Sequence, residues 1–293
     1  MAKTTARSGP RETHHTSERP RALDRSWCKF FTTANNSRGC SYALDERYHE
    51  GDSLQSRVMP DTDYYLYGIA TLPGRRAVNE DSASVFTAVA QAEDCLAIVA
   101  DGLGGHRGGR EASNLAVREF VARYRALSAT LDPHGAAQEA LAGVNQLIHT
   151  RGSRDPNMAQ MGTTFTALIL IGSQAEIVHI GDTRAYRLRA GRLEQLTQDH
   201  NLAMVGRPNV LYRALGTDTY AEADHEECAV QLHDRFLLCS DGVHGVLSDT
   251  TLTALLGRAE NLQACAEHIT EAALFADSQD NVTAVIVETA GQM

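Results

Sequence analysis

Two kinds of hydrophobic pattern follow one another along this chain of 293 residues, and regular patterning begins near Tyr64. Short apolar or alternating runs, separated by glycine-containing or polar turns, predict antiparallel strands joined by hairpins. We expect strands at residues 64–71, 81–89, 95–100, 163–171, 176–180, 185–189, 227–232, 235–239 and 281–288. Blocks with a period near 3.6 residues predict helices at residues 110–128, 133–150, 248–258 and 261–275.

The order of these elements predicts the fold class. Hairpins interrupted by pairs of helices favour an α+β architecture with two packed antiparallel sheets and helices outside them. Residues 64–293 are therefore expected to form one domain. Residues 1–63 are rich in Thr, Ser, Arg, His and Pro without sustained periodicity. Such a composition predicts a disordered or poorly ordered N-terminal extension.

Composition narrows the function classes. The formal net charge of −10 argues against non-specific binding to nucleic acid or to an anionic membrane surface. No apolar run approaches the roughly 20 residues that a membrane-spanning helix needs, and the polar start of the chain lacks a signal-peptide apolar region. The six cysteines are scattered without metal-binding or disulfide-rich spacing, which favours the reducing cytoplasm.

Four short acidic clusters at the ends of apolar segments carry the candidate chemistry. They are Asn79-Glu80-Asp81, Asp101-Gly102-Leu103-Gly104-Gly105-His106, Ser240-Asp241-Gly242 and Asp280-Asn281. Two of the aspartates, Asp101 and Asp241, follow nearly continuous apolar runs that predict strands covered on both faces. A carboxylate at the rim of such a core is costly unless a cation lies beside it.

Convergence of these carboxylates would require metal ions. Four carboxylates about 5 Å apart repel one another by roughly 20 kcal/mol in total at an effective dielectric constant near 20, which exceeds the stability of a typical domain. Two divalent ions would neutralise them, and an all-oxygen donor set favours Mg²⁺ or Mn²⁺ over Zn²⁺. A two-metal site suits phosphate-ester hydrolysis, and Arg76, four residues before Glu80, is the candidate phosphate ligand.

Eight short motifs, taken in order, identify a family. They are Arg76-x-x-Asn79-Glu80-Asp81, Asp101-Gly-x-Gly-Gly-His106, Met161-Gly-Thr-Thr164, Gly181-Asp182-Thr-Arg-Ala-Tyr186, Leu196-Thr-x-Asp199-His200, Arg213-Ala-Leu-Gly216, Leu238-Cys-Ser-Asp241-Gly242 and Asp280-Asn281-x-Thr283. Over residues 64–289 the chain resembles the metal-dependent serine/threonine protein phosphatases of the type 2C group, in its bacterial form.

The resemblance implies a four-layer α-β-β-α sandwich with the metals at one end of the paired sheets. Matched by position, Asp101 would bridge both metals, Asp241 and Asp280 would complete the first, and Glu80 with the carbonyl of Gly102 would complete the second. Asp81 would lie in the outer shell, and Arg76 would bind the phosphate. Catalytic roles would fall to Arg76, Asp101 and Asp241. Asp182 with Asp241 would form a third metal site, although a turn aspartate that caps a hairpin explains Asp182 equally well.

Some positions depart from the family pattern. Leu103 stands where animal relatives carry a histidine proposed as general acid, so protonation of the leaving group has no assigned residue. Gly245 stands where many members have a further aspartate for the third metal, which puts that site in doubt. Residues 201–212 are short where bacterial relatives have a longer flap. His179 and His244 are interpreted as structural residues rather than metal ligands.

The expected function is hydrolysis of phosphoserine and phosphothreonine in proteins by a water or hydroxide that bridges two Mg²⁺ or Mn²⁺ ions. The expected partners are phosphorylated proteins and a cognate bacterial serine/threonine kinase in signal transduction, and the chain is expected to be monomeric.

An alternative is a catalytically weak or inactive phosphatase-fold module that binds phosphoproteins. A cysteine-dependent phosphatase is excluded because no cysteine has an arginine six residues later. The motif set and acidic charge disfavour a two-metal nuclease.

Overall fold

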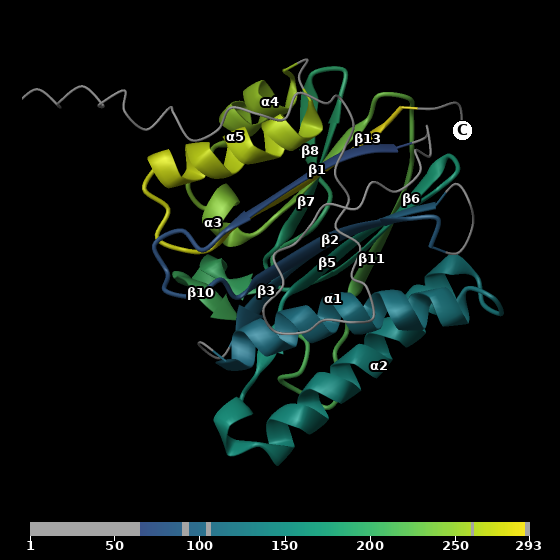
Figure 1. The fold of residues 1–293 in the computed structure, drawn as a ribbon, viewed down its shortest axis with the longest axis vertical. Coiled ribbons are helices and arrows are strands. Elements are labelled where there is room, and N and C mark those ends of the chain that lie inside the picture. The colour runs from purple at the N-terminus through teal and green to yellow at the C-terminus, as the bar shows by residue number, and fades with distance from the viewer. Residues whose placement is uncertain (1–64, 90–93, 104–106, 259–260, 291–293) are drawn as a thin grey trace, which may run out of the picture. The chain divides into compact units, whose positions relative to one another are not determined.

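The structure, a computed structural model, describes residues 65–89, 94–103, 107–258 and 261–290 (Figure 1). The predicted N-terminal extension, residues 1–63, lies outside the described residues. Two antiparallel sheets dominate the described part of the chain. One sheet has the spatial order β1 (Tyr65–Leu72), β13 (Val282–Thr289), β12 (Arg235–Cys239), β7 (Arg184–Arg189) and β8 (Arg192–Gln195).

The second sheet has six strands. Its order is β11 (Asp224–Ala229), β6 (Gln174–Ile180), β5 (Phe165–Ile171), β3 (Asp94–Leu103) and β2 (Asp81–Thr87), with the short β4 (Gly162–Thr163) paired to β3. A separate two-stranded ribbon joins β9 (Asn201–Leu202) to β10 (Arg207–Leu211), with the 3₁₀ turn η3 (Ala203–Val205) between them. This ribbon occupies the region that the sequence predicted to be a short flap.

Side chains cap the starts of three of the described helices. In the described residues the helices are α1 (Arg107–Leu127), α2 (Pro133–Arg154), α3 (Asp241–His244), α4 (Asp249–Leu256) and α5 (Leu262–Phe275), with a 3₁₀ turn η2 (Pro156–Met158) after α2. Asp132 accepts a hydrogen bond from the amide of Gly135 at the start of α2, where Pro133 fits the first helical position. Ser248 and Asn261 cap α4 and α5 in the same way. None of the helices in the described ranges is long and apolar enough to span a membrane.

Three apolar clusters hold the layers together. The first packs α1 and α2 on one face of the six-stranded sheet, the second packs α4 and α5 on the five-stranded sheet, and the third lies between the two sheets. Strand β3 contributes to two of them: Leu96, Ile98 and Ala100 face the helices, and alternate residues face the other sheet. The predicted α-β-β-α order is therefore confirmed, as Figure 1 shows.

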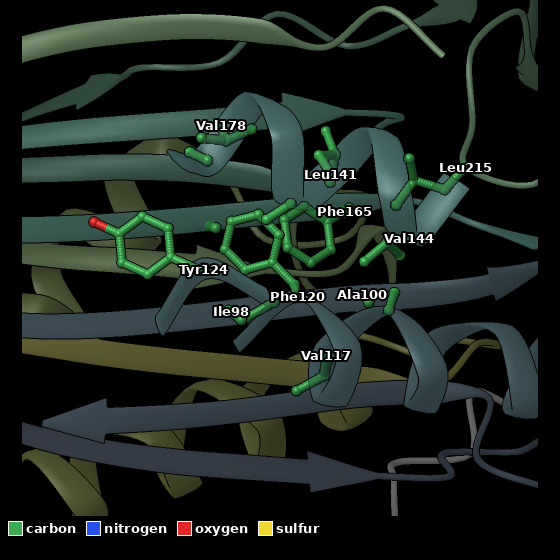
Figure 2. Packing of buried hydrophobic residues seen from close by; sticks show 14 of the residues in the cluster. Ile98, Ala100, Val117, Phe120, Tyr124, Leu141, Val144, Phe165, Val178 and Leu215 are labelled. Atoms are coloured by element: carbon green, nitrogen blue, oxygen red, sulfur yellow. The ribbon is translucent and has the colours of Figure 1, made fainter. Parts of the chain in front are cut away.

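The core beneath α1 shows why the predicted helical stripe forms. Phe120 and Tyr124 lie one turn apart, and both are buried. The Phe120 ring meets that of Phe165 on β5 at a centroid distance of 4.8 Å (Figure 2). Such a tilted aromatic pair adds to the stabilisation that comes from burying the rings.

The polar edges of the sheets differ from the prediction. The strand expected at residues 227–232 is β11, which begins and ends three residues earlier. Its first residues, Asp224, Glu226 and Glu227, are exposed because β11 is an edge strand, so they lack the apolar signal that marks a covered strand. Strand β8 and the β9–β10 ribbon were not predicted for the same reason.

Candidate metal centre

The acidic clusters meet at one end of the two sheets. Glu80 precedes β2 and Asp101 lies near the end of β3, and both strands belong to the six-stranded sheet. Asp241 follows β12 and Asp280 precedes β13, which are neighbours in the five-stranded sheet. The strand ends that the sequence picked out as separate clusters are thus brought together by the packing of one sheet on the other.

Hydrogen bonds tie the two sheets together at this end. Ser240 Oγ and Thr283 Oγ1 donate to Asp81 Oδ2 at 2.8 and 2.6 Å. The amide of Glu80 donates to Asn281 Oδ1 at 2.9 Å, and the Asn281 amide nitrogen donates to two backbone carbonyls in the 73–78 turn. Sequence reasoning gave these three polar residues no role. Their adjacency to the motif aspartates is the only signal that could have found them.

Burial and, after it, the charges of neighbouring carboxylates raise the pKa values of the aspartates at this centre. Burial, followed by the charges of other aspartates, holds the pKa of Asp101 well above its usual range. Those other aspartates are Asp81, Asp241, Asp182 and Asp280. Burial and the charge of Asp280 raise the pKa of Asp241 to about 6. Burial also raises the pKa of Asp81 to about 7, although the Thr283 and Ser240 hydroxyls oppose the shift.

Two buried carboxylate oxygens at this centre are unsatisfied. Asp81 Oδ1 and Asp241 Oδ1 have no hydrogen-bond partner within the described ranges. A buried oxygen of this kind is costly unless a cation or donor reaches it. Among the described residues, the carboxylate and carbonyl oxygens at the centre are the kind of donors that Mg²⁺ and Mn²⁺ prefer. The residues present therefore fit a pair of such ions.

Glycines allow the backbone to close around Glu80. The amide of Gly102 donates to the Glu80 carbonyl at 3.2 Å. A Cβ atom on Gly109, in the first turn of α1, would lie 2.3 Å from Glu80 Oε2 and 2.8 Å from the Gly102 carbonyl. A side chain at position 109 would thus displace the carboxylate. Gly104 and Gly105, from the same glycine-rich stretch, lie outside the described residues.

Arg76 reaches the centre from the turn between β1 and β2. Its Nη2 atom donates to Asp280 Oδ2 at 2.7 Å, and its side chain is 58% exposed. Gly74 adopts a positive φ of 59° in this turn, and a Cβ there would lie 2.0 Å from the Asp280 carbonyl oxygen. The structure therefore places a guanidinium group with solvent-facing donors beside the acidic centre, where the sequence expected one.

Asp182 adjoins the same centre. Burial, then the charges of Asp241 and Asp199, raise the pKa of Asp182 to about 7. The preceding Gly181 has a φ of 109°. Its carbonyl accepts a hydrogen bond from the backbone amide of His200 at 2.7 Å. Gly245 offers no carboxylate beside Asp182, so the acidic environment here comes from the two neighbouring aspartates.

The histidines near this centre have structural partners. Burial lowers the pKa of His179 to about 4, and its ring lies 2.9 Å from Thr166 Oγ1 and 3.0 Å from the Gln198 carbonyl. His244 Nε2 is 2.8 Å from the Asp182 carbonyl, and burial lowers its pKa to about 4 as well. Both interactions agree with the structural roles predicted for these two residues.

Comparison with known proteins agrees with this geometry. Residues 74–286 match the family model described as Protein phosphatase 2C. The serine/threonine phosphatase stp of Listeria monocytogenes serotype 4b (strain F2365) is 33% identical over 228 residues, which span 72% of this chain and 90% of that protein. The crystal structure of the Mycobacterium tuberculosis serine/threonine phosphatase PstP/Ppp aligns with a TM-score of 0.70 at 29% identity, covering 78% of this chain and 100% of that one.

A further solved structure contains metal. The catalytic domain of the serine/threonine protein phosphatase PstP in complex with two manganese ions aligns with a TM-score of 0.68 at 31% identity, covering 78% of this chain and 99% of that one. The family match extends over the strands and turns that carry Arg76, the acidic clusters and Asp182. This chain belongs to the protein phosphatase 2C family.

Proposed function

We propose that this protein hydrolyses phosphoserine and phosphothreonine in proteins, with Mg²⁺ or Mn²⁺ as cofactor. The observation that carries the proposal is the convergence of mutually repelling carboxylates from both sheets beside a partly exposed arginine, in a chain of the protein phosphatase 2C family. A domain organisation with the catalytic domain at residues 64–293 is part of the proposal, and the family match at residues 74–286 supports it.

The ligand roles that we propose are those that the family resemblance implies for the matching motif residues. Asp101 would contact both ions, Asp241 and Asp280 the first, and Glu80 with the carbonyl of Gly102 the second. When bound, the two ions supply the Lewis acidity that activates a water molecule and neutralises phosphate charge. By the same resemblance, Asp182 together with Asp241 would hold a third, weaker ion, and a turn aspartate that caps a hairpin remains the alternative role for Asp182.

The side chains of this protein hold and orient the substrate. The side chain of Arg76 is 58% exposed while its Nη2 atom is fixed on Asp280, so its planar guanidinium fork can bind two phosphate oxygens. Asp81, fixed by the Ser240 and Thr283 hydroxyls, positions the turn that carries Glu80. We place Asp81 outside the ligand set, as a positioning residue.

The substrates we propose are phosphorylated proteins, and a cognate serine/threonine kinase is the partner that would generate them. A role in bacterial signal transduction, a cytoplasmic location and a monomeric state complete the proposal. Support for the substrate class comes from the relatives, whose names describe serine/threonine phosphatases. The binding-module alternative is less consistent with the full set of carboxylates and Arg76 at one centre.

Phosphate release from matched phosphoserine, phosphothreonine and phosphotyrosine peptides tests the proposal. We expect Mn²⁺-dependent turnover of the first two peptides, reduced by Asp241→Asn to the rate of the metal-free protein. Asp277→Asn is the matched control, because Asp277 is 70% exposed and pairs with Arg75 outside the centre. Tight binding of phosphopeptides without any Mn²⁺-dependent turnover would establish the binding-module alternative instead.

A further inference from the structure

A second group of metal-binding side chains lies away from the carboxylate centre. His134, Glu176 and His225 each offer one ligand atom, and these atoms all lie within 4.8 Å of one another. His134 belongs to the first turn of α2, Glu176 to β6, and His225 to the edge strand β11. The three residues are distant in sequence, so only the packing of α2 on the edge of the six-stranded sheet brings them together.

This group and the carboxylate centre lie at different positions along strand β6. Gly181, next to Asp182, packs on Thr164, whose amide donates to the Asp101 carbonyl. Glu176 lies five residues before Gly181 along β6, which corresponds to roughly 16 Å of extended strand. The side chain of Glu176 is on the helix-facing side, as is Val178, which pairs with His225. The group is therefore separate from the residues assigned to the phosphatase centre.

The Nδ1 atoms of both imidazoles lie close to the same carboxylate oxygen of Glu176. Nδ1 of His225 lies 2.9 Å and Nδ1 of His134 lies 3.1 Å from Glu176 Oε1. The two rings are 4.4 Å apart between centroids and tilted by 58°. Tetrahedral Zn²⁺ with bonds of about 2.0–2.2 Å holds neighbouring ligand atoms roughly 3.4 Å apart. The ligand atoms of the two imidazoles lie within 4.8 Å of each other. Side-chain rotations that widen the two distances to Glu176 and set the imidazole nitrogens at the same spacing would admit the ion.

In the part of the chain that the structure describes, no Lys or Arg forms an ion pair with the carboxylate of Glu176. The residue is only 7% exposed, and its cross-strand neighbour on β11 is another acid, Glu227. Within the described ranges its ion pairs are with His134 and His225, which are charged only when protonated. When the imidazoles are neutral, a buried carboxylate is left without compensating charge, which is unfavourable. A divalent ion would supply that charge and would use the neutral imidazoles as ligands.

We propose that His134, Glu176 and His225 bind one Zn²⁺ ion. Two imidazole nitrogens and one carboxylate oxygen form a donor set that suits zinc, in contrast to the all-oxygen donors of the carboxylate centre. The side chain of His134 is 47% exposed, which gives the ion a path from solvent and leaves its fourth position to water. The bound ion joins the start of α2 to β6 and β11, and so stabilises the helical layer on the sheet edge.

Titration of Zn²⁺ into a variant whose carboxylate centre is disabled tests zinc binding. The parent for the test is the full chain with Asp241→Asn, kept in excess Mg²⁺, so that Zn²⁺ at the carboxylate centre is suppressed. We expect one Zn²⁺ per chain by calorimetry and elemental analysis, with a higher Tm on zinc addition. His134→Ala and Glu176→Gln should each weaken zinc binding by about 100-fold or more, since each removes a ligand.

Controls separate the loss of a ligand from misfolding. His134→Ala alters a half-exposed side chain, so the variant should fold, which circular dichroism would verify. His233→Asn removes a histidine that is 71% exposed and pairs with Glu288 elsewhere, and it should leave zinc binding unchanged. Co²⁺ in place of zinc should give the intense visible absorption of a tetrahedral site, and His225→Ala should abolish that absorption.

The outcome that overturns the proposal is specific. If the parent binds no zinc in excess Mg²⁺, or if His134→Ala and Glu176→Gln bind zinc as tightly as the parent, the three residues form only a hydrogen-bonded cluster. Neither result depends on whether the protein dephosphorylates peptides, because binding and thermal stability are measured on a variant that is inactive by design.

Discussion

Asp81 and Asp101 lie directly opposite each other on the neighbouring strands β2 and β3. Like charges in such facing positions destabilise a sheet. Here Asp81 is held by hydroxyl groups from the other sheet, and the charge of Asp81 is one of the causes that raise the pKa of Asp101. These two facing carboxylates therefore favour a bound cation even without the carboxylates of the five-stranded sheet.

The hydroxyl of Thr283 should matter for stability. Thr283→Val keeps the shape of the side chain but leaves the buried Asp81 carboxylate with one donor fewer. We expect the free energy of unfolding to fall by about 1–3 kcal/mol, measured by urea denaturation in EDTA. Thr130→Val is the matched control, because the Thr130 hydroxyl is exposed and bonds a helix-end carbonyl. Equal effects of the two substitutions would contradict the role assigned to the Thr283–Asp81 hydrogen bond.

The metal-free protein should lose stability as the pH rises. Burial raises the folded-state pKa of Asp81 and Asp182 to about 7 and of Asp241 to about 6, above the value of 3.8 for an unperturbed aspartate. The folded state thus binds more protons than the unfolded state between about pH 4 and pH 7, and stability decreases across that window.

Urea midpoints in EDTA from pH 4 to pH 8 measure this decrease, and Mn²⁺ should remove most of it near neutral pH. The variant Asp241→Asn, which removes one of the repelling charges, should show a shallower decrease. A midpoint that rises steadily over the same range would show that the carboxylates are not crowded in the folded protein.

Arg76 should act on catalysis more than on folding. Arg76→Ala removes the phosphate ligand and the partner of Asp280, and we expect kcat/KM with a phosphopeptide to fall by about 10²–10³-fold. Arg76→Lys should recover only part of this loss, because an ammonium group cannot bind two oxygens in a planar fork. The neighbouring Arg75→Ala, which breaks a surface pair with Asp277, should change kcat/KM little. Similar losses for Arg75 and Arg76 would contradict the assignment.

Gly109 should control metal affinity through the position of Glu80. A Cβ atom at residue 109 would lie 2.3 Å from Glu80 Oε2, so Gly109→Ala must move that carboxylate. We expect Mn²⁺ to bind about 10-fold more weakly or worse, measured by calorimetry. In Gly143→Ala, the added Cβ meets mainly the flexible end of Arg123, so this helix glycine is the control. Unchanged Mn²⁺ affinity in Gly109→Ala would show that Glu80 is not a ligand.

Much of the fold could be predicted because its central elements have strong periodic signals. Residues 95–100 form a continuous apolar run because β3 is covered on both faces, and the stripe through Phe120 and Tyr124 marks the buried side of α1. Edge elements carry no such signal. Asp224 and Glu226 are exposed on β11 and lie before the strand predicted at residues 227–232, because nothing local distinguishes them from loop residues.

The residues of the site also fall into those that the sequence could predict and those that it could not. The aspartates that end apolar strands, such as Asp101 and Asp241, could be located because a charge at the rim of a core is unusual. Ser240 and Thr283 stand in the same motifs, but their hydrogen bonds to Asp81 could not be predicted, because they reach it across more than 150 residues of chain. The cluster around Glu176 was missed for the same reason, because its two histidines come from helix α2 and strand β11, which are distant in sequence.

Strand β3 carries Asp101 and is covered on both faces. Ile98 touches the helical layer while Val99 touches the opposite sheet, and both are fully buried. Interior changes that shift this strand by a fraction of an ångström would move a reactive carboxylate by the same amount. Turnover in this protein should therefore be sensitive to substitutions that never meet a substrate, and attempts to improve its thermal tolerance should leave the centre of the six-stranded sheet untouched.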